Sequence, residues 1–263
     1  MHSDKKVVLV RKNKTVMVPC GIPYIFGTLK DASKNRIPDA MLINADAVIL
    51  GMGVVPNTNI AKEAGIKVNE KGAIVVDEYM RTNERDIFAV GDCAEKRCFF
   101  TNKEIPVLLA STAAMEAKVA ASNLYGLRYV RENKGTISAF STKVFNKTFA
   151  AAGLTERRIK EEGFEVTIGK FTTMDKHPGS LPGTSKLELT LIFVKTSGVL
   201  IGAQISGGES VGEMINILSL AIQKCLTANE LNTLQVATHP ILTASPIAYP
   251  INAAALDALI KIK

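Results

Sequence analysis

One stretch of this chain constrains its fold more than any other: residues 81–95, which read RTNERDIFAVGDCAE. A threonine and a short polar turn precede the apolar segment Ile87–Val90, which predicts a buried strand. Gly91 and Asp92 follow it, so one carboxylate stands at the carboxyl end of a strand, where α/β folds bind ligands. Gly91 lets a ligand approach the backbone closely, and Asp92 can accept hydrogen bonds from ligand hydroxyl groups. The stretch therefore predicts an α/β fold with a ligand site at Gly91 and Asp92.

A second stretch, residues 18–26, reads VPCGIPYIF and places Cys20 between Pro19 and Gly21 in a turn-rich loop. Residues 81–95 resemble the second FAD-binding motif of the flavoprotein disulfide reductases with two dinucleotide domains. Residues 18–26 resemble the active-site loop of the branch of that family that holds coenzyme A-disulfide reductases, NADH oxidases and persulfide reductases. The resemblance implies that Asp92 binds the ribityl hydroxyls of FAD, that Pro19 and Cys20 lie beside the flavin, and that NAD(P)H is the electron donor.

The glycine-rich phosphate turns of that family are missing from this sequence. Members carry two Gly-x-Gly-x-x-Gly turns, whereas here Gly51-Met-Gly53-Val-Val-Pro56 has proline at the third glycine position. The chain opens where the family's second strand would stand, and it passes from Met41 to Asp46 where a nicotinamide domain of ~100–150 residues is expected. We therefore expect an internally deleted or truncated relative.

The expected fold class is α/β and α+β. A partial FAD-binding, Rossmann-like domain is predicted over residues 1–127, with the NAD domain missing near 42–46. An antiparallel α+β layer is predicted over residues 128–263, because strands joined by hairpins are followed by helices. The resemblance implies that this layer is the dimerisation domain of the family. Its expected elements are paired strands at 136–141 and 148–152, a helix from Thr155 to Gly163, strands at 164–171, 187–195 and 199–205, and capping boxes at 210–213 and 227–230.

The long Ala-rich helix expected at 111–125 could contribute to the same site. The first N–H groups of a helix are free and carry partial positive charge. In the family this end faces the flavin pyrimidine, so the resemblance assigns Leu109, Ala110, Thr112 and Ala113 to FAD binding. An ordinary helix capped by Ser111 fits the sequence equally well.

The cysteines and histidines give further candidates. Redox work needs an accessible, stabilised thiolate, and the resemblance assigns that role to Cys20, although a small buried loop residue is the common alternative. Cys93, Cys98 and Cys225 are expected to be structural, with Cys225 on an apolar helix. His239, in Thr-His-Pro, can shuttle protons and is a second catalytic candidate, but the next acid is Asp257, so its dyad is incomplete. A turn histidine at a dimer interface is the alternative reading.

Composition narrows the classes of partner. The net charge is +7, from 32 basic and 25 acidic residues, but these are spread along the chain without interleaved aromatics, which disfavours nucleic-acid binding. Some relatives bind coenzyme A, whose phosphates favour Lys and Arg. The four cysteines lack zinc spacing, no metal site is predicted, and no apolar run reaches the ~18 residues of a membrane span. With too short an apolar run for a signal peptide, the cytoplasm is the simplest expectation.

Three functional hypotheses remain open. The first is an FAD-dependent, NAD(P)H-linked oxidoreductase acting on a disulfide, a persulfide or oxygen, with Cys20 as its redox cysteine and a homodimer as its assembly. The second is an inactive dimerising remnant, because FAD would lose the backbone cradle of its pyrophosphate. The third, a basic nucleic-acid binder, is the least favoured.

Overall fold

The computed structural model describes residues 53–125 and 132–262 in full, together with the backbone of four strands nearer the N-terminus. The chain forms two compact units, Met1–Val54 and Val55–Lys263. The division at residues 127 and 128 into a cofactor-binding and a dimerisation domain stays a prediction.

The first unit contains a four-stranded sheet in the order β3-β2-β1-β4. Its strands are β1 (Lys6–Arg11), β2 (Lys14–Val18), β3 (Ile25–Gly27) and β4 (Ala40–Asn44). β2 is antiparallel to both β1 and β3, whereas β4 is parallel to β1. The sequence pattern predicts strands at 6–11 and 15–18, which β1 and β2 confirm, but β3 lies inside the loop expected at 19–38. Pro19, Cys20 and the strand expected at residues 47–50 lie outside the described residues.

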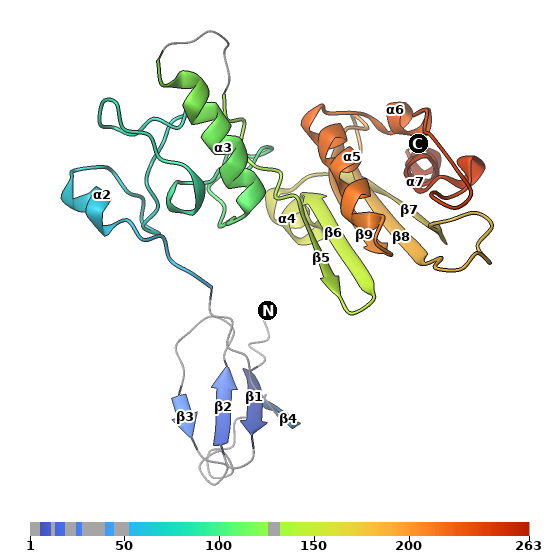
Figure 1. The fold of residues 1–263 in the computed structure, drawn as a ribbon, viewed down its shortest axis with the longest axis horizontal. Coiled ribbons are helices and arrows are strands. Elements are labelled where there is room, and N and C mark those ends of the chain that lie inside the picture. The colour runs from blue at the N-terminus through green and yellow to red at the C-terminus, as the bar shows by residue number, and fades with distance from the viewer. Residues whose placement is uncertain are drawn as a thin grey trace. The chain divides into compact units, whose positions relative to one another are not determined.

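The second unit begins with a segment that has little regular structure (Figure 1). Its elements are α2 (Asn59–Glu63), the 3-10 turn η1 (Gly91–Cys93) and α3 (Ala110–Asn123). The strand predicted at Ile87–Val90 is not formed: a single antiparallel bridge joins Phe88 to Arg81, and Ile87 is 41% exposed. The reason is local, because Met80 and Asp86 both adopt positive φ and turn the backbone on each side of the bridge.

The predictions for the two helices of this segment are confirmed within a residue or two. Gly65, with φ +79°, stands just after the end of α2 in the left-handed conformation that the sequence predicted. A small apolar core holds the segment together, formed by Ala61, Ile74, Met80, Ala89, Ala94, Val119 and Ala120.

The rest of the unit is an antiparallel sheet in the order β5-β6-β9-β8-β7, with helices packed on it (Figure 1). The strands are β5 (Phe140–Val144), β6 (Lys147–Gly153), β7 (Val166–Met174), β8 (Lys186–Val194) and β9 (Leu200–Gly207). The helices are α4 (Glu156–Glu162), α5 (Val211–Gln223), α6 (Ala228–Asn232) and α7 (Pro250–Lys261), with a 3-10 turn η2 (Pro246–Ala248). This layer confirms the predicted antiparallel α+β class.

Side-chain alternation along β8 explains the layering. Leu187, Leu189, Leu191 and Phe193 face the core shared with α5 and α7, whereas Ile192 joins a second core on the opposite face. That second core also contains Ile159 of α4 and Cys98 and Ile105 from the first segment. The irregular segment is therefore packed onto the sheet by apolar contact.

Capping predictions had mixed outcomes. Thr155 caps α4, which ends at Gly163 with φ +74°, and Thr227 forms the predicted capping box with Glu230. The box predicted at Ser210 is wrong: Ser210 has helical backbone angles, and its hydroxyl makes no cap hydrogen bond. Cys225 lies beyond the end of α5 with φ +54° and is exposed, so its predicted place on the helix is also wrong.

Candidate functional site

The Gly91–Asp92 turn sits against the first turns of α3. Val90 is extended, and Gly91 then adopts φ +76°, a conformation that favours glycine. A Cβ built on Gly91 would lie 3.5 Å from the Cβ of Ala113. Asp92 is exposed, and its carboxylate has no hydrogen bond or ion pair within the described part of the chain. The fold thus presents a free acceptor on a turn that touches the helix.

The buried ion pair Lys96–Glu116 holds this turn in place. Lys96 Nζ lies 3.0 Å from Glu116 Oε2, and the two side chains are only 3% and 0% exposed. The backbone N–H of Gly91 donates to the same Glu116 oxygen at 2.9 Å. Lys96 Nζ donates to the carbonyl of Gly91, and to that of Ala94 at 2.8 Å. Both backbone polar groups of Gly91 are therefore bound to the pair.

Sequence reasoning missed this pair. Glu116 stands four residues after Thr112 and three and four before Val119 and Ala120, which all lie on the buried face of α3. A charged residue on that face indicates a buried partner, and this was the available signal. Nothing in the local sequence marks Lys96 as that partner.

The N-terminus of α3 has no side-chain cap. Its N-cap is Leu109, so the helix begins at Ala110, and Ser111 is not the cap. Ala110 and Ser111 are exposed, and no acidic residue lies in the first turn. The first-turn N–H groups thus keep their partial positive charge. Thr112 is buried, and its hydroxyl lies 3.3 Å from that of Thr136, so its side chain already has a partner.

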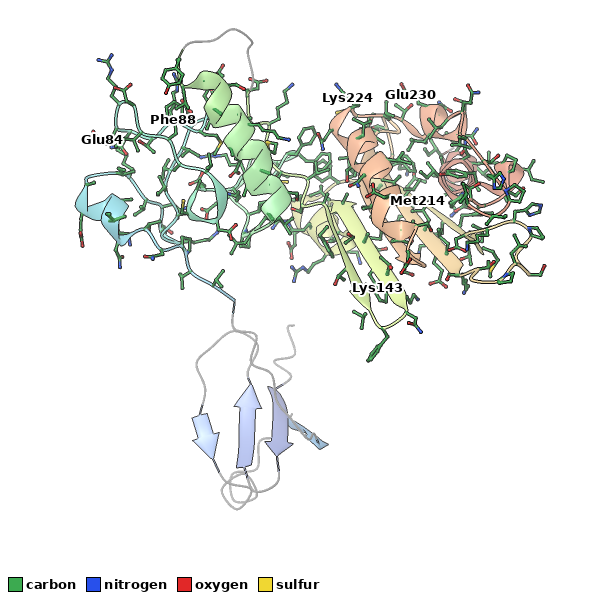
Figure 2. The ribbon with its side chains drawn as sticks, viewed as in Figure 1. Glu84, Phe88, Lys143, Met214, Lys224 and Glu230 are labelled. Atoms are coloured by element: carbon green, nitrogen blue, oxygen red, sulfur yellow. The ribbon has the colours of Figure 1, made fainter. Side chains whose placement is uncertain are left out.

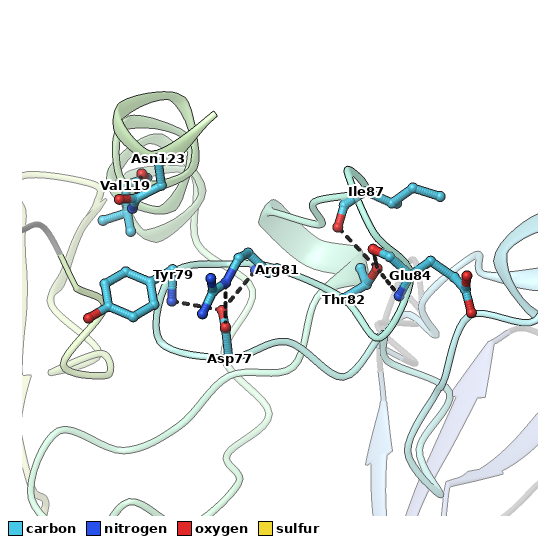
Figure 3. A network of polar contacts seen from close by, with 8 residues as sticks. All are labelled: Asp77, Tyr79, Arg81, Thr82, Glu84, Ile87, Val119 and Asn123. Carbon is cyan, nitrogen blue, oxygen red and sulfur yellow. Dashed lines mark hydrogen bonds and ion pairs between the residues drawn. The ribbon is translucent and has the colours of Figure 1, made fainter. Parts of the chain in front are cut away.

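The loop before the turn is held by short-range polar contacts (Figure 3). Asp77 accepts the backbone N–H groups of Tyr79 and Arg81, each at 2.9 Å, and Arg81 Nε at 2.7 Å. The Thr82 hydroxyl lies 3.0 Å from the carbonyl oxygen of Ile87. These contacts close the loop locally, in place of a strand ladder.

A groove runs between α3 and α5. Its volume is about 890 Å³, and residues from both helices line it, among them Ser111, Thr112, Met115, Gly212, Ile215 and Ser219. The exposed start of α3 therefore opens onto a space large enough for a sizeable ligand.

His239 lies away from these groups. It is exposed, and within the described residues no acidic side chain contacts its imidazole. The backbone N–H of Ile241 donates to His239 Nδ1 at 3.4 Å. Asp257, the next acid, is instead bound to Lys261 Nζ at 2.5 Å and to the backbone N–H of Lys170 at 2.8 Å. The catalytic role of His239 and its incomplete dyad stay a prediction.

A cleft of about 540 Å³ lies between α5 and the C-terminal segment. Figure 2 labels Met214 and Lys224 near the two ends of α5. Tyr249 lines this cleft, and burial raises the pKa of its phenol above the ordinary value of 10.0. Most of the lining is apolar and comes from Leu187, Met214, Ile217, Leu220, Leu242 and Ala244.

The remaining cysteines form no cluster. Cys98 is buried in the apolar core, and Cys93 is half-buried with its Sγ 3.3 Å from the carbonyl oxygen of Val90. Among the residues described, no three His, Cys, Asp or Glu side chains come together as a metal site. In the same residues no helix has both the length and the apolar character that a membrane crossing requires.

Two family models match this chain. Residues 4–122 match the pyridine nucleotide-disulphide oxidoreductase model, and residues 139–247 match the dimerisation domain of the same oxidoreductases. Among curated proteins, an NADH oxidase from Methanocaldococcus jannaschii is 33% identical over 224 residues, which are 85% of this chain and 48% of that protein. A coenzyme A disulfide reductase from Staphylococcus aureus is 30% identical over 195 residues, which are 74% of this chain and 44% of that protein.

A solved structure of a related enzyme is also similar to this chain. The NAD-dependent persulfide reductase from A. fulgidus superposes with a TM-score of 0.74 at 33% identity, covering 97% of this chain and 43% of that one. The chain spans about half the length of the curated relatives it matches. Its sequence and its fold place this protein in the family of pyridine nucleotide-disulphide oxidoreductases, which depend on FAD and NAD(P)H.

Proposed function

We propose that this chain acts as a flavin-dependent pyridine nucleotide-disulfide oxidoreductase with a single redox cysteine, of the NADH oxidase or coenzyme A-disulfide and persulfide reductase type. The observation that carries the proposal is the exposed carboxylate of Asp92, which has no partner among the described residues and lies on a turn packed against α3. Names of the relatives support the reaction class, since they include an NADH oxidase and a coenzyme A disulfide reductase.

The described residues fit part of an FAD molecule. Asp92 would accept hydrogen bonds from ribityl hydroxyls, and Gly91, without a Cβ, would admit them close to the backbone. Leu109, Ala110 and Thr112 belong to the N-terminus of α3, whose free N–H groups would face the flavin pyrimidine. Reduction builds negative charge on that ring, and these groups would stabilise it. Ala113 contributes packing instead, because its N–H already donates to the carbonyl of Leu109 at 3.0 Å. When bound, FAD supplies the two-electron redox centre.

Cys20 is the proposed nucleophile, with Pro19 as its flavin-side neighbour. Its thiolate would attack a disulfide sulfur, forming a mixed disulfide and releasing one thiolate. A hydride equivalent from NAD(P)H, two electrons and one proton, then returns Cys20 to the thiolate and releases the second thiol. Coenzyme A-type thiols are the proposed substrates, and a reducing cytoplasm is the setting that keeps Cys20 as a thiol.

His239 is the proposed proton donor to the first released thiolate. Its imidazolium form would give a ring proton to the thiolate, and the exposed ring would then take another proton from solvent. Tests of this role compare the pH dependence of turnover between the parent and His239→Gln. An unchanged profile would remove His239 from the mechanism.

The proposed assembly is a homodimer formed through the α+β layer. Large apolar side chains are exposed on α5 and α7, including Ile217, Leu220, Leu256 and Ile260. Ile217 and Leu220 are three residues apart and Leu256 and Ile260 four apart, so each pair shares one face of its helix and could contact a second copy of the chain. Light scattering should give twice the monomer mass, and a monomer at micromolar concentration would contradict the assembly.

The decisive experiment for the function is a visible absorption spectrum after FAD is added and the excess removed. A flavin band near one equivalent supports the proposal, and bleaching by NAD(P)H then tests the donor. A colourless protein supports the alternative, an inactive dimerising remnant that no longer binds FAD.

Cys20→Ser separates chemistry from binding. We expect it to abolish disulfide reductase activity and to leave flavin binding unchanged, because the hydroxyl cannot form a mixed disulfide. Cys93→Ser is the matched control and should keep activity. Reductase activity retained in Cys20→Ser would exclude Cys20 as the redox residue.

A further inference from the structure

We propose that the buried pair Lys96–Glu116 is the positioning element of the Gly91–Asp92 turn, setting where the Asp92 carboxylate stands relative to α3. Its consequence for cofactor affinity rests on the proposed function. Its consequence for the turn itself does not, because the contacts exist without a ligand.

The pair contacts the turn at both of its backbone groups. Glu116 Oε2 accepts the N–H of Gly91, and Lys96 Nζ donates to the Gly91 carbonyl. The same ammonium group donates to the carbonyl of Ala94, which closes the 3-10 turn from its other end. The Gly91 carbonyl also accepts the backbone N–H of Ala94 at 3.0 Å, so the pair adds to that turn bond and supplies the acceptor for the Gly91 N–H.

Glu116 belongs to α3, so the pair links the turn to the helix as well. Glu116 lies one helical turn after Thr112, and Ala113 packs on Gly91 from the same helix. The two parts of the proposed FAD site, the Asp92 carboxylate and the free end of α3, are therefore joined through the Glu116 carboxylate, which is fully buried. This is a positioning role, not a catalytic one.

A gain in stability does not by itself explain why a buried ion pair stands at this position. Two charges lose their hydration when buried, and replacing a buried pair with apolar residues of similar size is often neutral or stabilising. Glu116 Oε1 is buried without a hydrogen-bond partner among the described residues, which is a further cost. What an apolar pair cannot provide is an acceptor for the N–H of Gly91, or an ammonium group that binds the carbonyls of Gly91 and Ala94 together.

The test compares the full chain with the double variant Lys96→Met/Glu116→Met. The two methionines retain the volume and remove both charges, so the variant is expected to stay folded. We expect FAD affinity to fall by about tenfold or more, because two hydrogen bonds that fix Gly91 are lost. Exposed Arg157–Glu161 on α4 gives the matched control, and Arg157→Met/Glu161→Met should bind FAD like the parent.

A second readout needs no cofactor. Amide hydrogen exchange, followed by mass spectrometry, should show faster exchange in the peptide spanning 88–96 of the double variant, while peptides of α5 keep the protection seen in the parent. If the double variant exchanges faster at 88–96 and the parent binds no FAD, the positioning role is supported and only the proposed function is contradicted. Parent-like exchange at 88–96, or parent-like FAD affinity in the folded double variant, would overturn the positioning role.

A conservative variant separates geometry from charge. In Glu116→Gln, the amide oxygen can still accept the N–H of Gly91, and the amide nitrogen takes the place of the unpartnered Oε1. We expect its exchange at 88–96 to stay closer to the parent than that of the double variant. If Glu116→Gln exchanged as fast as the double variant, the charge rather than the acceptor would hold the turn, and the proposed geometry would be wrong.

Discussion

The segment from residue 53 to 125 and the antiparallel layer that follows it reach their structures in different ways. The layer has long strands, a core rich in leucine and isoleucine, and helices on both faces, with α5 and α7 on one and α4 on the other. The segment has one long helix and a small alanine-rich core, and isolated bridges replace a sheet. Its chain is held at chosen points by polar groups, of which Asp77, Lys96 and Glu116 are the clearest.

The two regions differ because apolar packing and directional polar contacts do different things. Apolar packing makes a layer stable, but it does not orient a single peptide group. Hydrogen bonds and ion pairs are directional, so they can fix a loop in the position that a ligand requires. The candidate site accordingly lies in the part of the unit with the least regular structure, which is packed on the sheet through Cys98 and Ile105.

The largest effect that tests this comparison is expected from Lys96→Met alone. It leaves the Glu116 charge buried without a partner, which should lower the free energy of unfolding by about 3–5 kcal/mol. Lys96→Met/Glu116→Met should recover most of that loss. Chemical denaturation of both variants measures the difference. A double variant as unstable as the single one would mean that the segment depends on this pair for stability, as the layer depends on its core.

In the layer, the strongest test is overpacking between α7 and β7. A Cβ on Gly169 would come within 1.9 Å of the carbonyl oxygen of Ala254, so backbone must move. Gly169→Ala should cost about 1–3 kcal/mol of unfolding free energy. Gly212→Ala, on α5 with no atom within 4 Å of the new Cβ, is the control and should be neutral or slightly stabilising. Equal melting temperatures for the two variants would contradict the close packing of α7.

A smaller effect is expected at the cap of α6. Thr227→Ala removes the side-chain acceptor of the Glu230 N–H and half of the capping box. The loss should be about 1 kcal/mol, as for other N-caps. Thr227→Ser keeps the hydroxyl and should stay close to the parent in thermal unfolding. A serine variant as unstable as the alanine variant would show that the threonine methyl, not the cap, matters here.

The smallest effect is a pH dependence at the same box. Hydrogen bonds from the Thr227 hydroxyl and backbone N–H hold the pKa of Glu230 below its ordinary value of 4.5. The folded pKa is the lower one, so this contribution to stability is complete above pH 4.5 and is lost as the pH falls through the folded value. Glu230→Gln should flatten the decline of stability with acidity below that pH. A decline as steep as that of the parent would remove Glu230 from the acid response.

The sequence by itself determined the α+β layer and the family. Alternating apolar residues predict the strands, because successive side chains on a strand point to opposite faces. Thr155 and Thr227 begin their helices and Gly163 ends one, each through local hydrogen bonds. Gly91 and Asp92 were also found from sequence, since a glycine followed by an acid after an apolar run is a local signal. Their roles in binding stay a proposal.

Only the tertiary structure decided how that site is held. The strand predicted before Gly91 is not formed, because the backbone turns at Met80 and Asp86 and, among the described residues, only the bridge to Arg81 pairs with it. Lys96 and Glu116 are 20 residues apart in sequence, and only the packing of α3 brings them within 3.0 Å. Local patterns carry information about local hydrogen bonds and buried faces, whereas a buried ion pair depends on which two surfaces the completed fold brings together.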